Sequence, residues 1–157
     1  LSVITAGIAE PGQETANSEN LRLAVNYRDL DGNPLDVSRL RAGTDFVAEY
    51  QVTNPGSLGI YYRQMALRQA VASGWEIVND RLDAVSDGQA ESGYAYKDVR
   101  DDRVFTFFDL ANGRTATYRI RLTATYPGRY YLPGQVCEAM YDEEISASTE
   151  GKWVVVE

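Results

Sequence analysis

Hydrophobic and polar residues alternate along most of the chain. In the clearest case, apolar side chains occupy the even positions of one segment, with threonine or arginine between them: Ala116, Tyr118, Ile120, Leu122, Ala124 and Tyr126. The same period of two recurs over residues 21–28 and 46–53. Alternation of this kind turns one face of a strand toward a core and the other toward water. It predicts half-solvated antiparallel strands.

Other segments have the length and composition of strands: Ser2–Ala6, Gln64–Ala70, Trp75–Asn79, Val104–Leu110, Gln135–Ala139 and Lys152–Val156. Turn-forming residues separate them, and one helical turn near Asp36–Arg41 is the only departure we expect. Many short strands with regular turns predict an all-β fold, an antiparallel β-sandwich of immunoglobulin or fibronectin-III type with long loops. Tyr130, after Pro127-Gly128-Arg129, occupies the position of a tyrosine corner in such sandwiches.

The chain has 157 residues, which is enough for one domain spanning residues 1–157. A sandwich of this type needs about 100 residues, so the surplus is expected in two loops, Ala9–Asn20 and Arg81–Asp102. The second loop shows no clear strand pattern and contains Tyr94 and Tyr96. Because long loops on a rigid sandwich commonly bind ligands, these two tyrosines are candidate binding residues. The chain starts at Leu1 without a leader-like segment, as a mature chain or a piece of a longer one would.

Composition excludes several classes of function. Histidine is absent and Cys137 is the single cysteine. The chain therefore lacks Ser-His-Asp catalysis, histidine metal sites, an internal disulfide and thiolate clusters. We expect no cofactor and no metal. The formal net charge is −8, which makes nucleic acids and anionic membranes poor partners.

Three groups of residues could carry chemistry, but each has a simpler structural interpretation. The Asp29–Asn33 segment resembles the start of a calcium loop, although the twelfth position is Leu40 rather than glutamate. We interpret it as a hairpin turn. The acids Asp98, Asp101, Asp102 and Asp109 could supply a carboxylate pair for glycoside cleavage, but nearby arginines favour a salt-bridge network. Cys137 precedes Glu138, which disfavours a thiolate, so it is expected in the core.

The segment from Cys137 to Glu144 contains Met140 and Tyr141 at the end of a predicted strand, followed by three acids. Two arrangements remain open from the residues themselves. The pair could close one end of the core. Alternatively, it could form an exposed contact surface, because methionine and tyrosine are favoured where one surface docks on another.

Four stretches, in family order, resemble the C-terminal (tenth) macroglobulin domain of bacterial alpha-2-macroglobulins. They are Tyr27–Asp36, Ser73–Asn79, Asp98–Arg103 with Phe107–Leu110, and Tyr126–Asp142. The resemblance implies a macroglobulin β-sandwich at the C-terminus of a much larger chain, a protease trap in the periplasm or cell envelope of a Gram-negative bacterium. The trap holds an internal thioester that acylates proteases.

The resemblance further implies a non-enzymatic role. The partners would be the thioester domain and other macroglobulin domains of the parent chain, with target proteases reached indirectly. Any membrane attachment would come from a lipid anchor elsewhere in the parent. By position, Met140 and Tyr141 would shield the thioester from water. Cys137 is not the thioester cysteine, because the motif Cys-x-Glu-Gln is not matched from Cys137 to Met140.

Two other functions remain open. The chain could be a stand-alone, secreted or envelope-bound binding module for a carbohydrate or protein, using Tyr94 and Tyr96, since aromatic faces stack on sugars and partners. A carboxylate-based hydrolase using the acids near Asp101 is the least favoured of the three.

Overall fold

Strands are the only regular secondary structure in the computed structural model, which describes residues 17–78, 96–100 and 102–157. The largest sheet has six strands. In spatial order they are β1 (Asn17–Glu19), β12 (Asp142–Ser148), β11 (Val136–Ala139), β5 (Tyr62–Ala70), β8 (Arg103–Leu110) and β7 (Tyr96–Val99). No helix long and apolar enough to cross a membrane is found among the described residues.

Two smaller sheets complete the fold. The second has four antiparallel strands in the order β2 (Arg22–Asp29), β4 (Thr44–Thr53), β9 (Thr115–Ala124) and β6 (Trp75–Val78). The third consists of β10 (Gly128–Leu132), β13 (Lys152–Val156) and β3 (Arg39–Leu40). Its short β13–β3 contact is parallel, whereas the other strand pairs of the described residues are antiparallel.

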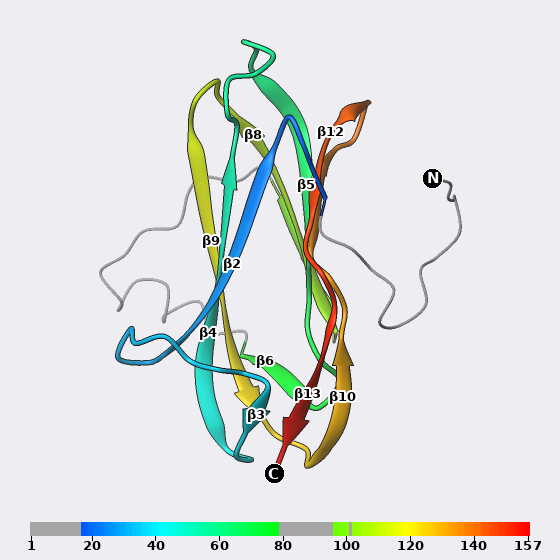
Figure 1. Cartoon of the computed structure of the whole chain (residues 1–157). Coiled ribbons are helices and arrows are strands. Elements are labelled where there is room, and N and C mark those ends of the chain that lie inside the picture. The colour runs from blue at the N-terminus through cyan, green and yellow to red at the C-terminus, as the bar shows by residue number, and fades with distance from the viewer. Residues whose placement is uncertain (1–16, 79–95, 101) are drawn as a thin grey trace.

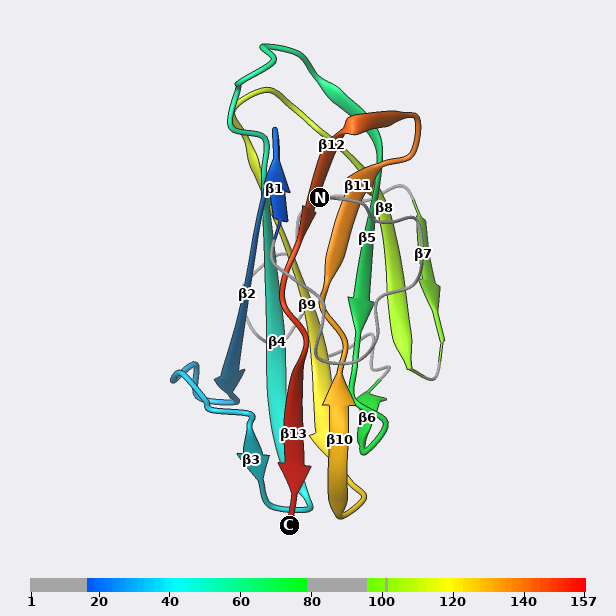
Figure 2. The ribbon, with the colours of Figure 1, turned by 45° about the vertical axis from the view of Figure 1, so that its right-hand side comes forward.

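The six-stranded and four-stranded sheets pack face to face (Figure 1). Their inward side chains form a shared core, and Phe108 on β8 meets Tyr118 on β9 with ring centroids 5.0 Å apart. The three-stranded sheet lies at the end of the molecule where the chain terminates (Figure 2). This arrangement confirms the predicted antiparallel β-sandwich.

The alternation of apolar and polar residues in the sequence matches the alternation of buried and exposed side chains in the structure. On β9, residues 116, 118, 120, 122 and 124 are buried and their neighbours are partly exposed. Two local expectations are wrong: the Arg81–Asp102 segment contains strand β7, and the Ala9–Asn20 segment contains β1. Near Asp36 the structure has a turn at Val37 and Ser38, as expected, but the chain continues from it into the short strand β3. All three strands are short and lie at sheet edges, where few inward side chains are needed and the sequence pattern is weak.

One long hairpin crosses from the third sheet to the first. Its two arms are β10 with β11 and β12 with β13, and the pairing register is the same on both sides of the interruption: Leu132 faces Lys152 and Val136 faces Ser148. At the interruption, Thr149 N–H donates to the carbonyl oxygen of Gln135 at 2.9 Å. The hairpin therefore connects the end of the sandwich that carries the three-stranded sheet to the opposite end, where β11 turns into β12.

The tyrosine corner is present. Tyr130 donates its hydroxyl hydrogen to the carbonyl oxygen of Pro127 at 3.0 Å. Its ring lies directly over Gly74, where a Cβ atom would come within 2.1 Å of the ring. A glycine is therefore required at position 74 for the β10 strand to approach the turn before β6.

Candidate functional site

Met140 and Tyr141 form the tip of the β11–β12 hairpin. Ala139 pairs with Asp142, so these two residues make the whole turn. Two-residue turns usually carry Asn-Gly or Asp-Gly, because the favoured turn types need positive φ angles. Neither Met140 nor Tyr141 has a positive φ angle. The requirements of the turn therefore do not explain why two large side chains occupy it.

Both side chains of this tip lie in solvent. The exposed fraction is 52% for Met140 and 82% for Tyr141. Of the two arrangements left open by the sequence, the structure has the exposed one. Large side chains in this position contribute little to the core. They are typical of a surface that another molecule or domain covers.

The acids after Tyr141 give one side of the tip a negative charge. Asp142 Oδ1 accepts a hydrogen bond from the Glu144 backbone N–H at 3.0 Å, which shapes the start of β12. The Glu144 carbonyl oxygen accepts a hydrogen bond from the Asn20 side-chain amide at 2.9 Å. The side chains of Glu143 and Glu144 are exposed. They can therefore pair with basic groups of a partner.

The tip is fastened to β5 at a strained residue, Gln64. The Met140 backbone N–H donates to the Gln64 carbonyl oxygen at 3.0 Å, and the Gln64 N–H donates to Asp109 Oδ1 at 2.8 Å. Gln64 has a φ angle of +56°, and the β5–β8 register shifts between Tyr62 and Met65. Bulges of this kind bend a strand and redirect its neighbours. This one sets the position of the Met140–Tyr141 turn relative to the sheet.

Cys137 lies inside the core on β11, as expected. Its side chain is buried. Burial, and to a smaller extent the neighbouring charge of Glu138, raises the pKa of the thiol far above its ordinary value. The thiol therefore stays protonated and is a poor nucleophile.

The acids proposed for a hydrolase site are engaged elsewhere. Arg100 donates to Asp98 Oδ2 through Nε and Nη2 at 3.1 and 3.0 Å. Arg103 binds both oxygens of Asp102 at 3.0 and 2.9 Å, and this hydrogen bonding lowers the pKa of Asp102. Asp101 lies outside the described residues. The salt-bridge interpretation is confirmed for Asp98 and Asp102.

The Asp29 segment forms a turn closed by its own backbone. Asp29 Oδ1 accepts hydrogen bonds from the backbone N–H groups of Asp31 and Asn33, both at 2.9 Å. The bond from Asn33 is the largest cause of the lowered pKa of Asp29. This carboxylate therefore organises the turn. Among the described residues, no group of three or more histidine, cysteine, aspartate or glutamate side chains could hold a metal ion.

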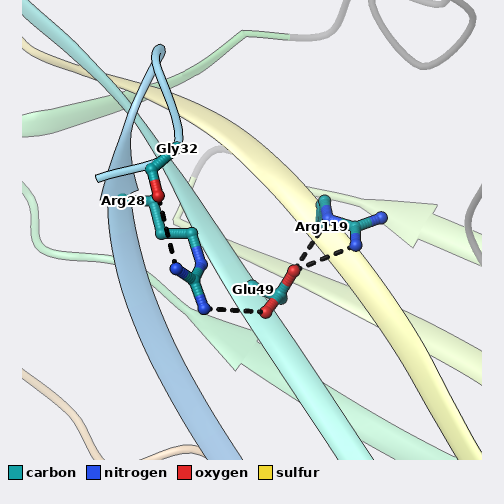
Figure 3. A network of polar contacts seen from close by, with 4 residues as sticks. All are labelled: Arg28, Gly32, Glu49 and Arg119. Atoms are coloured by element: carbon teal, nitrogen blue, oxygen red, sulfur yellow. Dashed lines mark hydrogen bonds and ion pairs between the residues drawn. The ribbon is translucent and has the colours of Figure 1, made fainter. Parts of the chain in front are cut away.

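A polar hollow of about 460 Å³ lies between this turn and the outer face of the four-stranded sheet. Figure 3 shows the Glu49 carboxylate between two arginines. Arg119 reaches Glu49 Oε2 through Nε at 3.0 Å and Nη2 at 2.9 Å, and Arg28 Nη2 lies 3.7 Å from Glu49 Oε1. Sequence reasoning missed this network, because the alternation marks Glu49 and Arg119 only as outward-facing. The β4–β9 register makes them direct neighbours.

The candidate binding tyrosines remain untested. Tyr94 lies outside the described residues. Tyr96 begins strand β7, at the edge of the six-stranded sheet.

The arrangement as a whole resembles known proteins in both sequence and fold. Residues 21–144 match the family model described as the bacterial alpha-2-macroglobulin MG10 domain. An alpha-2-macroglobulin of Xylella fastidiosa (strain Temecula1) is 29% identical over 150 residues, which cover 87% of this chain and 9% of that protein. The chain thus spans about a tenth of the length of the curated relative.

Solved structures share the fold. The alpha-2-macroglobulin of Salmonella, in a form reacted with methylamine, superposes with a TM-score of 0.78 at 21% identity, covering 91% of this chain and 10% of that one. The native alpha-2-macroglobulin of Escherichia coli gives a TM-score of 0.80 at 18% identity, covering 92% and 10%.

Proposed function

The chain belongs to the family of bacterial alpha-2-macroglobulin MG10 domains, and we propose that it works as one non-enzymatic domain of a much larger protease trap. In this proposal it forms a single domain over residues 1–157 and packs against the thioester domain of its parent chain. The parent lies in the envelope of a Gram-negative bacterium. The small share of each relative that the chain covers supports a role within a multidomain protein.

We propose further that Met140 and Tyr141 keep water from the thioester. The observation that carries this proposal is the exposed Met140–Tyr141 tip, whose backbone is held by the Met140 N–H bond to Gln64 and whose side chains are left uncovered by the described residues. A thioester hydrolyses in water, so it survives only where the site excludes solvent. An aromatic ring and a flexible thioether are suited to fill the space over such a bond, because methionine adapts to irregular gaps.

The test replaces both residues with alanine in the full-length parent. Methylamine attacks the thioester carbonyl, a C–N bond replaces the C–S bond, and the released cysteine thiol is counted with a chromogenic disulfide reagent. We expect thiol release about tenfold faster in the Met140→Ala/Tyr141→Ala variant, as a barrier lowered by about 1.4 kcal/mol would give.

Two residues elsewhere on the molecule serve as matched controls. Leu30 is as exposed as Met140, at 52%, and Tyr126 is 54% exposed. The Leu30→Ala/Tyr126→Ala variant also removes one exposed apolar and one exposed aromatic side chain, but from other turns, and its thiol release should follow the unmodified parent. Equal rates in all three proteins would refute the shielding role.

A further inference from the structure

Strand β5 is bulged beside the Met140–Tyr141 tip, and a side chain of β8 closes the bulge. Two residues of β5, Arg63 and Gln64, lie opposite one residue of β8, Asp109. A bulge takes backbone groups out of the regular ladder, and here the Gln64 N–H donates to Asp109 Oδ1 at 2.8 Å. The Gln64 carbonyl oxygen accepts the Met140 N–H at 3.0 Å. Asp109 therefore acts on the tip through the backbone of Gln64.

Strand β12 is bulged on the other side of the tip, and Asn20 closes that bulge. Residues 143–145 of β12 fall within the register shift and lie outside the β11–β12 ladder. The Asn20 side-chain amide donates to the Glu144 carbonyl oxygen in this bulge at 2.9 Å. Asn20 is itself fixed, because its Oδ1 accepts a hydrogen bond from the Ser57 hydroxyl at 2.8 Å and its carbonyl oxygen accepts one from the Tyr62 hydroxyl at 2.7 Å. Asn20 therefore connects the second arm of the tip to the β4–β5 loop and to β5.

Asn20 and Gln64 are also the two non-glycine residues with a positive φ angle in the part of the chain that the structure describes, at +55° and +56°. This conformation is costly for L-residues, although asparagine tolerates it better than most. Such residues persist where the surrounding structure fixes them, and they are concentrated at functional sites. One of the two holds each arm of the tip. The strained backbone is therefore placed where the tip is fastened.

The tip needs these bonds because packing does not hold it. Met140 and Tyr141 are exposed by 52% and 82%, so neither side chain anchors the turn in the core. A group that acts on a reactive bond must be placed to within about 1 Å. We propose that Asn20 and Asp109 are positioning residues of the tip, and that the protection of the thioester depends on both. This inference rests on the proposed function and names the residues that hold the shielding pair in place.

Amide hydrogen exchange of the Met140 N–H in the chain tests whether these residues hold the tip. Asp109→Leu removes the acceptor for the Gln64 N–H, and we expect exchange to become about tenfold faster, as loss of one hydrogen bond to a charged group gives. Asp109→Asn keeps an oxygen acceptor and should restore slow exchange. Asn20→Gly keeps the positive φ angle accessible and deletes the amide that binds Glu144, so exchange should be faster here too. Unchanged exchange in Asp109→Leu and Asn20→Gly would overturn the inference.

The Gly74→Ala variant separates positioning from stability. Gly74 lies against Tyr130 of the three-stranded sheet, at the end of the sandwich away from the tip (Figure 2). An added methyl group there should destabilise the fold by overpacking, while the Met140 N–H should exchange as in the unmodified chain. If Gly74→Ala accelerates this exchange as much as Asp109→Leu does, the effect is one of overall stability and the positioning role is wrong.

Thiol release by methylamine in the full-length parent connects the two residues to the thioester. Asp109→Leu and Asn20→Gly should release thiol faster, by at most the about tenfold expected of Met140→Ala/Tyr141→Ala, because the shielding side chains are still present. Asp109→Asn and Gly74→Ala should follow the unmodified parent. If Met140→Ala/Tyr141→Ala alone accelerates release, the inference is overturned and the proposed function stands. If that variant leaves the rate unchanged, the proposed function fails, and faster exchange of the Met140 N–H would still support the holding of the tip by Asn20 and Asp109.

Discussion

The side-chain amide of Gln135 binds both backbone groups of Ala70. Its Nε2 donates to the Ala70 carbonyl oxygen at 3.0 Å, and its Oε1 accepts the Ala70 N–H at 2.6 Å. The β5–β11 register pairs Arg68 with Val136, so its continuation would bring Gly134 opposite Ala70. The chain leaves the sheet there as the long hairpin crosses to β10. The Gln135 amide thus takes the place of a missing backbone partner.

Replacing Gln135 should destabilise the whole sandwich. Gln135 is buried, and Gln135→Leu keeps most of its volume while leaving both Ala70 groups without a partner. We expect the free energy of unfolding to fall by about 2–4 kcal/mol, since an unsatisfied buried polar group costs about 1–3 kcal/mol. Urea denaturation of the chain measures the change. Gln51→Leu, on the half-exposed outer face of β4, is the control and should change stability by less than about 1 kcal/mol.

The backbone of Gln64 can be tested separately from its side chain. Its φ angle of +56° is accessible to glycine without strain and strongly disfavoured for β-branched residues. Both Gln64→Gly and Gln64→Val delete the amide, so their difference reports the backbone. We expect Gln64→Val to be less stable than Gln64→Gly by about 1–2 kcal/mol, the cost of the left-handed conformation for an L-residue. Equal stability of the two variants in thermal unfolding would contradict a strained bulge.

The contact between Gly74 and Tyr130 gives a test by double mutation. In Gly74→Ala, the new methyl group would lie 2.1 Å from Tyr130 Cε2, so the ring and its strand must move. We expect a loss of about 1–3 kcal/mol in the free energy of unfolding, typical of overpacking. Tyr130→Ala should remove that clash, so the double variant should lose clearly less than the sum of the two single losses. Ser73→Ala, at an exposed neighbour, is the control, and a strictly additive pair would argue against the contact.

The sequence predicts the fold because the fold is encoded by local alternation. Apolar residues such as Tyr118 and Leu122 occupy every second position of β9. The buried face of this strand can therefore be recognised without knowing which other strands it contacts. The Met140–Tyr141 pair was also visible, as two large side chains before an acidic run. Its exposure was not predictable, because the two-residue turn is defined by the pairing of Ala139 with Asp142.

The remaining site features depend on contacts between residues far apart in the chain. Gln64 adopts its positive φ angle opposite Asp109, and Glu49 meets Arg119 through the β4–β9 register. The β4–β5 loop is shaped by the buried Asn54, whose neighbours Pro55 and Gly56 indicate only a turn in sequence. These features are determined by the strand register and by the crossovers between sheets, rather than by the residue types. Reasoning about single segments therefore missed them.

Stability should fall at alkaline pH because two ionisable side chains are buried in the core. Burial raises the pKa of Cys137 and of Tyr50, whose ordinary values are 9.0 and 10.0. Above pH 9 the unfolded chain loses these protons while the folded chain keeps them, so the folded state binds more protons. The free energy of unfolding then decreases with pH by up to about 1.4 kcal/mol per pH unit for each group. Below pH 9 this contribution is fully present.

The Tyr50→Phe variant isolates the contribution of Tyr50 to this loss of stability at alkaline pH. The Tyr50 hydroxyl is buried without a hydrogen-bond partner in the part of the chain that the structure describes. Its removal should leave stability at pH 7 unchanged or slightly raised, because a buried unpaired hydroxyl is unfavourable. Above pH 10 the variant should lose stability less steeply than the unmodified chain, by up to about 1.4 kcal/mol per pH unit. Urea unfolding at pH 7, 9, 10 and 11 measures both slopes, and parallel slopes would show that Tyr50 ionises as readily in the folded chain as in the unfolded one.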